Sequence, residues 1–298
     1  MSVDILILGA GWTSTFLIPL CQESKITCAA STRSGVGSTI QFEFQPNSDD
    51  PEPYKVLPDA TTVLITFPIT VSGASERLVR LYMSTRRDSA GDPPAFIQLG
   101  TTSIWDVRVE TDPAPSLLML KRRQKAPETM AALGSTIYDR RSPFNVTGRA
   151  NAEVELLALS PSLAPTTVLN LAGLWGGQRV VRNWLSRVAP SKDALAGKGS
   201  LHLIHGFDLA RAILAIHTNF AKAAGQRWIL TDGRVYDWWD LASAWDEEAA
   251  AWVRELMREG NIRVLPRNTE FLGRILDSRD FWDDFGLAPV RARLETGD

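Results

Sequence analysis

The chain has 298 residues, a formal net charge of −2, 44% hydrophobic residues and 22% charged residues. With charges of both signs dispersed along the chain, this composition argues against a nucleic-acid-binding surface or a basic patch for anionic membranes. The apolar runs are shorter than the roughly 20 residues that a membrane span needs. The length suits one α/β domain with a smaller appended lobe.

Cysteine use and the N-terminus favour a cytoplasmic protein. Cys21 and Cys28 are too few for a disulfide framework in a chain of this size, so we expect both to be reduced thiols. Asp4 comes too early for a signal peptide, and the apolar run that follows it ends at a glycine, as a buried strand does.

A glycine turn follows the first predicted strand. Residues 3–8 form a short apolar run, typical of a central parallel strand, and residues 9–14 read GAGWTS before an apolar helical stretch. In this context Gly9 permits a tight turn and Gly11 lets a pyrophosphate approach the backbone. The N–H groups of the first helical turn then receive its charge. We therefore predict that the turn binds a dinucleotide through these residues: Gly9, Gly11, Trp12, Thr13 and Ser14, the last a small residue where the motif has its third glycine.

The end of the second predicted strand indicates the choice of cofactor. Residues 26–30 are followed by Thr32, Arg33 and Ser34, with no acid to hold a ribose 2′-hydroxyl. An arginine between hydroxyl groups suits a 2′-phosphate, so NADP is favoured over NAD. The alternative is a solvated loop arginine.

Three further strands complete the predicted parallel sheet. They cover residues 39–44, 61–67 and 95–99, and a helix is expected over residues 75–83. Ligands bind at the carboxyl ends of such strands. We therefore expect Thr66 and Pro68 to lie beside the cofactor.

Three later segments carry a family resemblance. Residues 99–106 (LGTTSIWD), 169–179 (LNLAGLWGGQR) and 203–210 (LIHGFDLA) occur in the order of similar segments in the extended short-chain dehydrogenase/reductase superfamily. The resemblance is to its atypical epimerase/dehydratase-like members. It implies a Rossmann-type doubly wound sheet in an NAD(P)-binding domain over residues 1–175. A substrate lobe would occupy most of residues 176–298, with returns to the sheet.

The proton relay that the resemblance implies is missing. The family places Tyr-x-x-x-Lys on the helix after the fifth strand, and no such pair occurs in this chain. If Glu153 matches the glutamate common in that helix, over residues 145–153 here, Arg149 takes the lysine position and Asn145 the tyrosine position. Tyr138 does not restore the pair. An asparagine amide does not titrate, and arginine is a poor proton donor.

Hydroxyl groups remain as catalytic candidates. Thr101 lies where the family has its active-site serine or threonine, and Thr102 is adjacent; capping of a strand end is the alternative role. For His205 we expect a structural role, in the loop before the next helix. The remaining histidines lack partners at metal-ligand spacing, so no metal site is predicted.

The C-terminal half is rich in tryptophan. An amphipathic helix is predicted over residues 178–188, an apolar helix over 209–220, a strand near 228–233 and a long helix over 236–259. The predicted long helix carries Trp238, Trp239, Trp245 and Trp252. These rings are expected to fill a core, to line a pocket for an apolar small-molecule substrate, or to form a homodimer face.

Three functions stay open at this point. The first is an NADP-dependent oxidoreductase or epimerase-like enzyme that acts on a small carbonyl or carbinol substrate. It would use Thr101 or Thr102 to polarise the oxygen, with Arg149 holding the ribose, and water or substrate would supply the proton. The second is a non-catalytic NADP-binding regulator. The third is a non-redox isomerase or cyclase on the same fold.

Overall fold

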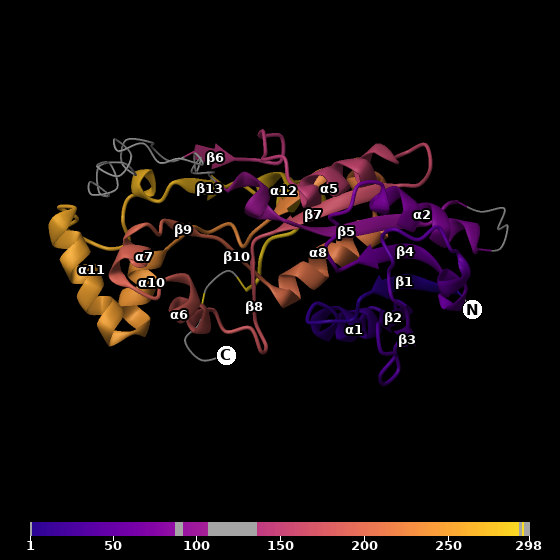
Figure 1. Cartoon of the computed structure of the whole chain (residues 1–298), viewed down its shortest axis with the longest axis horizontal. Coiled ribbons are helices and arrows are strands. Elements are labelled where there is room, and N and C mark those ends of the chain that lie inside the picture. The colour runs from indigo at the N-terminus through magenta and orange to yellow at the C-terminus, as the bar shows by residue number, and fades with distance from the viewer. Residues whose placement is uncertain (1, 87–91, 107–135, 292–293, 295–298) are drawn as a thin grey trace.

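A seven-stranded parallel sheet forms the centre of the computed structural model, which describes residues 2–86, 92–106, 136–291 and 294 (Figure 1). Its strand order is β3-β2-β1-β4-β5-β7-β11. The chain reverses its direction across the sheet at β1, so the crevice between the carboxyl ends of β1 and β4 is where a doubly wound sheet binds ligands. The strands are β1 (Ser2–Leu8), β2 (Cys28–Thr32), β3 (Ile40–Gln41), β4 (Asp59–Ile65), β5 (Ala95–Thr101), β7 (Thr166–Leu171) and β11 (Arg227–Leu230).

Helices cover both faces of this sheet, which explains the continuous apolar runs in its strands. In β1, Ile5 and Ile7 pack into one hydrophobic core with α1 (Ser14–Glu23) and α8 (Gly206–Thr218). The alternate residues Leu6 and Leu8 pack into a second core with α2 (Ala74–Ser84) and α5 (Gly148–Ala158). All four of these β1 side chains are fully buried. The predicted Rossmann-type doubly wound fold is therefore confirmed.

A second lobe lies at the other end of the long axis from β1 and β2 (Figure 1). Its helices enclose a core that contains Leu195, Trp239 and Val253. They are α6 (Leu185–Val188), α7 (Lys192–Ala196), α10 (Trp238–Trp245) and α11 (Glu247–Glu259), preceded by a short 3-10 turn, η3 (Val181–Trp184). Between these elements the chain returns to the central domain as α8 and β11.

Three short strand pairs connect the lobe with the central domain. The pairs are β8 (Gly173–Trp175) with β10 (Leu203–His205), β9 (Ser200–Leu201) with β12 (Tyr236–Asp237), and β6 (Thr136–Tyr138) with β13 (Arg274–Leu276). The last helix, α12 (Arg279–Phe285), packs its Phe281 and Trp282 into the core on the α1 side of the sheet.

Several predicted elements differ in extent. The third strand has only two residues, not the expected 39–44, because its chain turns away into the wall of a cavity after Gln41. The predicted helix over 236–259 was wrong: it is a strand followed by two helices. Asp246 breaks it, since its backbone is extended and its side chain accepts a hydrogen bond from Ala249 N–H, which caps α11. The predicted helix over 178–188 is a 3-10 turn and one helical turn.

The tryptophans of the C-terminal half belong to the lobe core. Trp238 and Trp239 are buried there, and Trp245 and Trp252 pack against them. None of these four rings lines either of the cavities described below. Of the alternatives open from the sequence, core filling therefore fits their positions.

Candidate functional site

Two adjoining cavities form a groove along the carboxyl ends of the central strands. The first has a volume of about 660 Å³ and lies beside β2 and β4. The second has about 310 Å³ and extends past β5 toward the residues after β7. They share Gly9, Gly11 and Thr66, so the glycine turn lies at the middle of the groove. This is the switch point of the sheet, where such folds bind their ligands.

The glycine turn presents unused backbone donors to this groove. The first hydrogen-bonded N–H of the helix is that of Ser14, which donates to Gly11 at 3.1 Å. Among the described residues, the N–H groups of Gly11, Trp12 and Thr13 donate to no protein atom. The first turn of α1 carries no acidic side chain either. Free N–H groups at a helix N-terminus form an anion site.

The two glycines of the turn have different surroundings. Gly9 has φ +94°, and a Cβ there would lie 2.6 Å from Thr66 Oγ1, whose hydroxyl donates to the Gly9 carbonyl at 2.6 Å. A Cβ on Gly11 would meet no atom within 4 Å. Gly9 therefore shapes the turn, whereas Gly11 leaves space above it, as a bound pyrophosphate requires.

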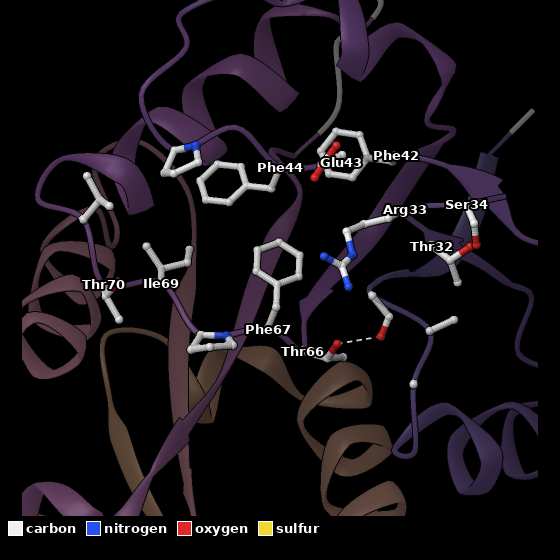
Figure 2. Close-up of a pocket in the computed structure, with 16 residues that line it drawn as sticks. Thr32, Arg33, Ser34, Phe42, Glu43, Phe44, Thr66, Phe67, Ile69 and Thr70 are labelled. Atoms are coloured by element: carbon white, nitrogen blue, oxygen red, sulfur yellow. Dashed lines mark hydrogen bonds between the residues drawn. The ribbon is translucent and has the colours of Figure 1, made fainter.

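One basic and one acidic residue, Arg33 and Glu43, line the first cavity together with aromatic side chains (Figure 2). Arg33 is exposed and its guanidinium points into the cavity, toward Thr66 and Phe67. Phe44 and Phe67 stack with ring centroids 5.5 Å apart, and Phe42 completes an aromatic wall. Nothing in the sequence pattern marked this wall, because its members come from separate loops after β3 and β4.

Thr101 and Arg149 meet in the second cavity. Thr101 ends β5, and its hydroxyl lies 3.1 Å from that of Ser103 and accepts the Ser103 N–H at 3.2 Å. Arg149 comes from the first turn of α5 and donates to the Leu99 carbonyl at 2.9 Å. Burial lowers the pKa of Arg149, although arginine stays protonated in proteins. A cation and a hydroxyl group are thus placed beside the end of β5.

Glu153, Arg227 and Asn170 form a buried network of ion pairs and hydrogen bonds next to Arg149. Glu153, only 2% exposed, lies 3.7 Å from the Arg149 Nε and forms an ion pair with Arg227. Asn170 donates to Glu153 at 2.8 Å and accepts from Arg227 at 2.9 Å. It also donates to the Thr101 carbonyl at 3.1 Å. Both walls of the second cavity are therefore joined through one network.

Solved structures match almost the whole chain. One is yeast methylglyoxal/isovaleraldehyde reductase with NADPH, which has a TM-score of 0.57 and 16% identity over 97% of this chain and 93% of that one. Another is MoeE5 with UDP-glucose and NAD, with a TM-score of 0.58 and 15% identity over 98% of this chain and 94% of that one. A third is UDP-N-acetylglucosamine 4-epimerase from Bacillus cereus, with a TM-score of 0.57 and 12% identity over 96% of this chain and 94% of that one. The chain shares the fold of these three structures. No family model and no curated protein matches the sequence.

The helix of this fold that was predicted to carry the proton relay begins later than expected. It starts at Gly148, capped by the Thr147 side chain, not at Asn145. Asn145 lies in the preceding segment and donates to the Asp106 carbonyl at 2.6 Å. It is therefore not one helical turn before Arg149. The described residues that line the second cavity include no Tyr, Lys, His, Asp, Glu or Cys.

The remaining predicted residues divide between the groove and its supports. Thr102 is 5% exposed and donates to the Leu171 carbonyl at 3.2 Å, so it faces the interior. Ser14 is also buried, and its hydroxyl donates to the Gly11 carbonyl at 2.5 Å. The other predicted cofactor and catalytic residues all line one or both cavities: Gly9, Gly11, Trp12, Thr13, Thr32, Arg33, Ser34, Thr66, Pro68, Thr101 and Arg149.

The histidines lie outside the groove. His205 caps α8 by accepting the Phe207 N–H at 3.1 Å. His202 is buried between β10 and β13, and His217 is within 2.8 Å of the Thr62 hydroxyl. Among the described residues, no group of three or more His, Cys, Asp or Glu is arranged to hold a metal ion, and no helix is long and apolar enough to cross a membrane. The sequence also suggests an insertion over residues 107–137, most of which lies outside the described residues.

One groove residue was missed from the sequence. Arg179 follows β8 and lines the second cavity, with its guanidinium carbon 4.5 Å from the centroid of the Trp12 ring. A solitary arginine after a glycine pair gives no periodic signal. Its placement depends on a turn that the sequence motif alone does not define.

Proposed function

We propose that this chain binds NADP and acts as an oxidoreductase or epimerase-like enzyme on a small carbonyl or carbinol substrate. One observation carries the proposal. A single groove has free N–H groups at its middle, Arg33 with hydroxyl groups at one end, and Thr101 with Arg149 at the other. This order matches the order of groups along a dinucleotide: adenosine 2′-phosphate, pyrophosphate and nicotinamide ribose.

The residues present fit such a cofactor. The free N–H groups of Gly11, Trp12 and Thr13 would receive the pyrophosphate. Arg33 and the hydroxyl-bearing residues beside it would hold the 2′-phosphate by charge-assisted hydrogen bonds. The adenine would pack on the aromatic wall of the first cavity, because flat rings stack on aromatic side chains.

The reacting end would use a fixed cation in place of a titrating acid. The nicotinamide, when bound, supplies or accepts the hydride. The Thr101 hydroxyl and the Arg149 guanidinium both line the second cavity, where they would donate hydrogen bonds to a substrate oxygen and stabilise negative charge that develops there. Because Arg149 keeps its proton, the proton that completes a carbonyl reduction would come from water or from the substrate.

A second function deserves a test because, in the described part of the chain, no residue that titrates near neutral pH lines the second cavity. Positioned general acid–base catalysis contributes about 10²- to 10⁴-fold to such reactions. A protein that binds NADP but lacks that contribution would serve as a regulator, or as a non-redox isomerase or cyclase.

Titration calorimetry with NADPH, followed by NADPH oxidation assays on a panel of small aldehydes and ketones, separates these functions. We expect NADPH binding together with slow turnover that Arg149→Met lowers about 100-fold. Arg187→Ala, which removes an exposed arginine outside both cavities, should leave turnover unchanged. NADPH binding without turnover on any substrate would favour the regulator or the non-redox enzyme. If NADPH does not bind, the proposal is wrong.

A further inference from the structure

A tight glycine turn places Arg179 beside the phosphate-binding turn. Gly176 and Gly177 follow β8 with φ +105° and +56°. The Gly176 and Arg179 backbones then exchange hydrogen bonds of 3.0 and 3.1 Å. A Cβ on Gly176 would lie 2.2 Å from His205 Nε2, so the turn packs directly on the N-terminal end of α8. The position of Arg179 is therefore set by backbone geometry.

Trp12 connects this turn with the glycine turn at the middle of the groove. Its indole N–H donates to the Gly176 carbonyl at 3.0 Å. The guanidinium carbon of Arg179 lies over the same indole ring, 4.5 Å from the ring centroid. Trp12 is also one of the residues with a free backbone N–H. Trp12 thus contributes a free backbone N–H to the anion site, and its ring packs against the guanidinium of Arg179 from the segment after β8. A cation stacked on an indole ring is held in place with its hydrogen-bond donors still available.

Within the part of the chain that the structure describes, no acidic group balances the charge of Arg179. Among the described residues, its guanidinium makes no hydrogen bond or ion pair, and no Asp or Glu lines the second cavity. This differs from Arg149, which lies next to Glu153. An arginine used only for stability usually has an acidic partner, whereas a fork of free donors suits phosphate oxygens.

We infer that Arg179, which lines the second cavity beside the N-terminus of α1, binds the pyrophosphate of the cofactor. The inference rests on the proposed function, since it takes the groove to hold a dinucleotide. The stacking partner favours pyrophosphate over substrate, because the Arg179 guanidinium lies on the ring of Trp12, which directly follows Gly11 in the glycine turn. The pyrophosphate would then contact both the free N–H groups of the glycine turn and this guanidinium.

Three ligands separate this role from the alternatives. NADPH contains the pyrophosphate, ADP-ribose contains it without nicotinamide or 2′-phosphate, and 2′-AMP has no phosphate at its 5′ position. For Arg179→Ala we expect binding of NADPH and of ADP-ribose to weaken about 10- to 100-fold, as for loss of a charge-assisted contact. Binding of 2′-AMP should stay within about twofold, because its only phosphate lies at the Arg33 end of the groove and the charge of Arg179 is screened there by salt. Arg179→Lys should give an intermediate loss, and Arg187→Ala should match the unmodified protein for all three ligands.

The possible results distinguish failure of the inference from failure of the proposed function. Unchanged ADP-ribose binding by a folded Arg179→Ala protein, checked by its melting temperature, overturns the inference. Equal weakening for all three ligands also overturns it, because that result reflects general electrostatics. A raised KM for a carbonyl substrate with unchanged ADP-ribose binding would assign Arg179 to an anionic group of the substrate. If the unmodified protein binds neither NADPH nor ADP-ribose, the proposed function fails together with the inference.

Discussion

The guanidinium of Arg149 donates a hydrogen bond to the Leu99 carbonyl at 2.9 Å and so joins the first turn of α5 to the end of β5. Glu153, one helical turn further along α5, lies on the other side of the same guanidinium, 3.7 Å from Nε. Arginine at this position keeps the positive charge of the lysine that the family resemblance implies. It cannot, however, exchange a proton near neutral pH.

Glu153 should matter for stability because it is the carboxylate that the buried Arg227 contacts. Glu153→Gln leaves the Arg227 charge buried without its counter-charge, and breaking such a pair typically costs about 3–5 kcal/mol. We expect the free energy of unfolding, measured by urea denaturation, to fall by that order. Glu23→Gln, at an exposed acid in the last turn of α1, should change it little. Equal effects of the two substitutions would mean that the network contributes nothing.

The two glycines of the turn should respond differently to valine. Gly11→Val places its side chain in open space, so we expect a near-normal melting temperature with NADPH binding abolished. Gly9→Val meets Thr66 Oγ1 and needs a positive φ, which costs a non-glycine residue about 1–3 kcal/mol before the clash is counted. Differential scanning fluorimetry and calorimetry measure both effects. NADPH binding that survives Gly11→Val would place the dinucleotide elsewhere.

Local sequence information was enough to predict the central domain. The apolar run of β1, the glycines after it and the start of α1 lie within some twenty consecutive residues, and each carries its own signal. Thr101 and Arg149, in contrast, were predicted only from the family resemblance, and both line the second cavity. The family resemblance supplied the order of the strands, which local patterns do not determine.

What the sequence did not predict depends on contacts between distant segments. Arg179 meets Trp12 across more than 160 positions of the chain, through a turn whose glycine torsion angles no motif specified. The aromatic wall likewise combines loops after two different strands. Asn145 was predicted to lie on a helix because it is eight residues before Glu153 in the sequence. Thr147 caps that helix, however, so the helix begins after Asn145. The helical spacing of apolar residues continues on both sides of Asp246, so the sequence pattern did not show that the helix ends there.

Cofactor preference should depend on Arg33. We expect NADPH to bind at least about tenfold more tightly than NADH, since a hydrogen bond to a charged group contributes about 1.5–3 kcal/mol. Arg33→Ala should remove this difference by weakening NADPH binding alone. Glu43 lines the same cavity, and its carboxylate would repel a 2′-phosphate, so Glu43→Gln should strengthen NADPH binding. Equal affinities of the unmodified protein for NADPH and NADH would contradict the prediction.

His202 should make stability depend on pH. Burial lowers the pKa of His202 to about 4, and the Leu276 N–H donates to its Nε2 at 3.2 Å. The unfolded chain therefore takes up a proton at this residue at higher pH than the folded protein does. Its stabilising contribution is complete above pH ~6.5 and declines as the pH falls toward about 4, at about 1.4 kcal/mol per pKa unit.

The test for His202 is the difference in free energy of unfolding between the unmodified protein and His202→Gln. Burial raises the pKa of Asp232 to about 6, which gives a slope of opposite sign over an overlapping range. Urea denaturation of the unmodified protein and of His202→Gln between pH 4 and pH 7 cancels the Asp232 contribution. We expect the loss caused by His202→Gln to shrink as the pH falls. A loss that is constant with pH would show that His202 titrates normally in the folded protein.

Substitutions at the adjacent residues Thr101 and Thr102 should affect turnover and stability differently. Thr101 lines the second cavity, whereas Thr102 is buried and donates to the Leu171 carbonyl. For Thr101→Ala we expect turnover to fall about 100-fold, as when one preorganised donor is removed from a reacting oxygen. Stability should fall by only about 0.5–1 kcal/mol, for the lost cap at Ser103. Thr102→Val keeps its shape but leaves a carbonyl unpaired, so it should lower stability by about 1–3 kcal/mol with turnover nearly unchanged. Thr101→Ser keeps the hydroxyl and should retain most activity. If Thr102→Val lowers turnover as much as Thr101→Ala does, in proteins with equal melting temperatures, Thr101 is not the group that contacts the substrate oxygen.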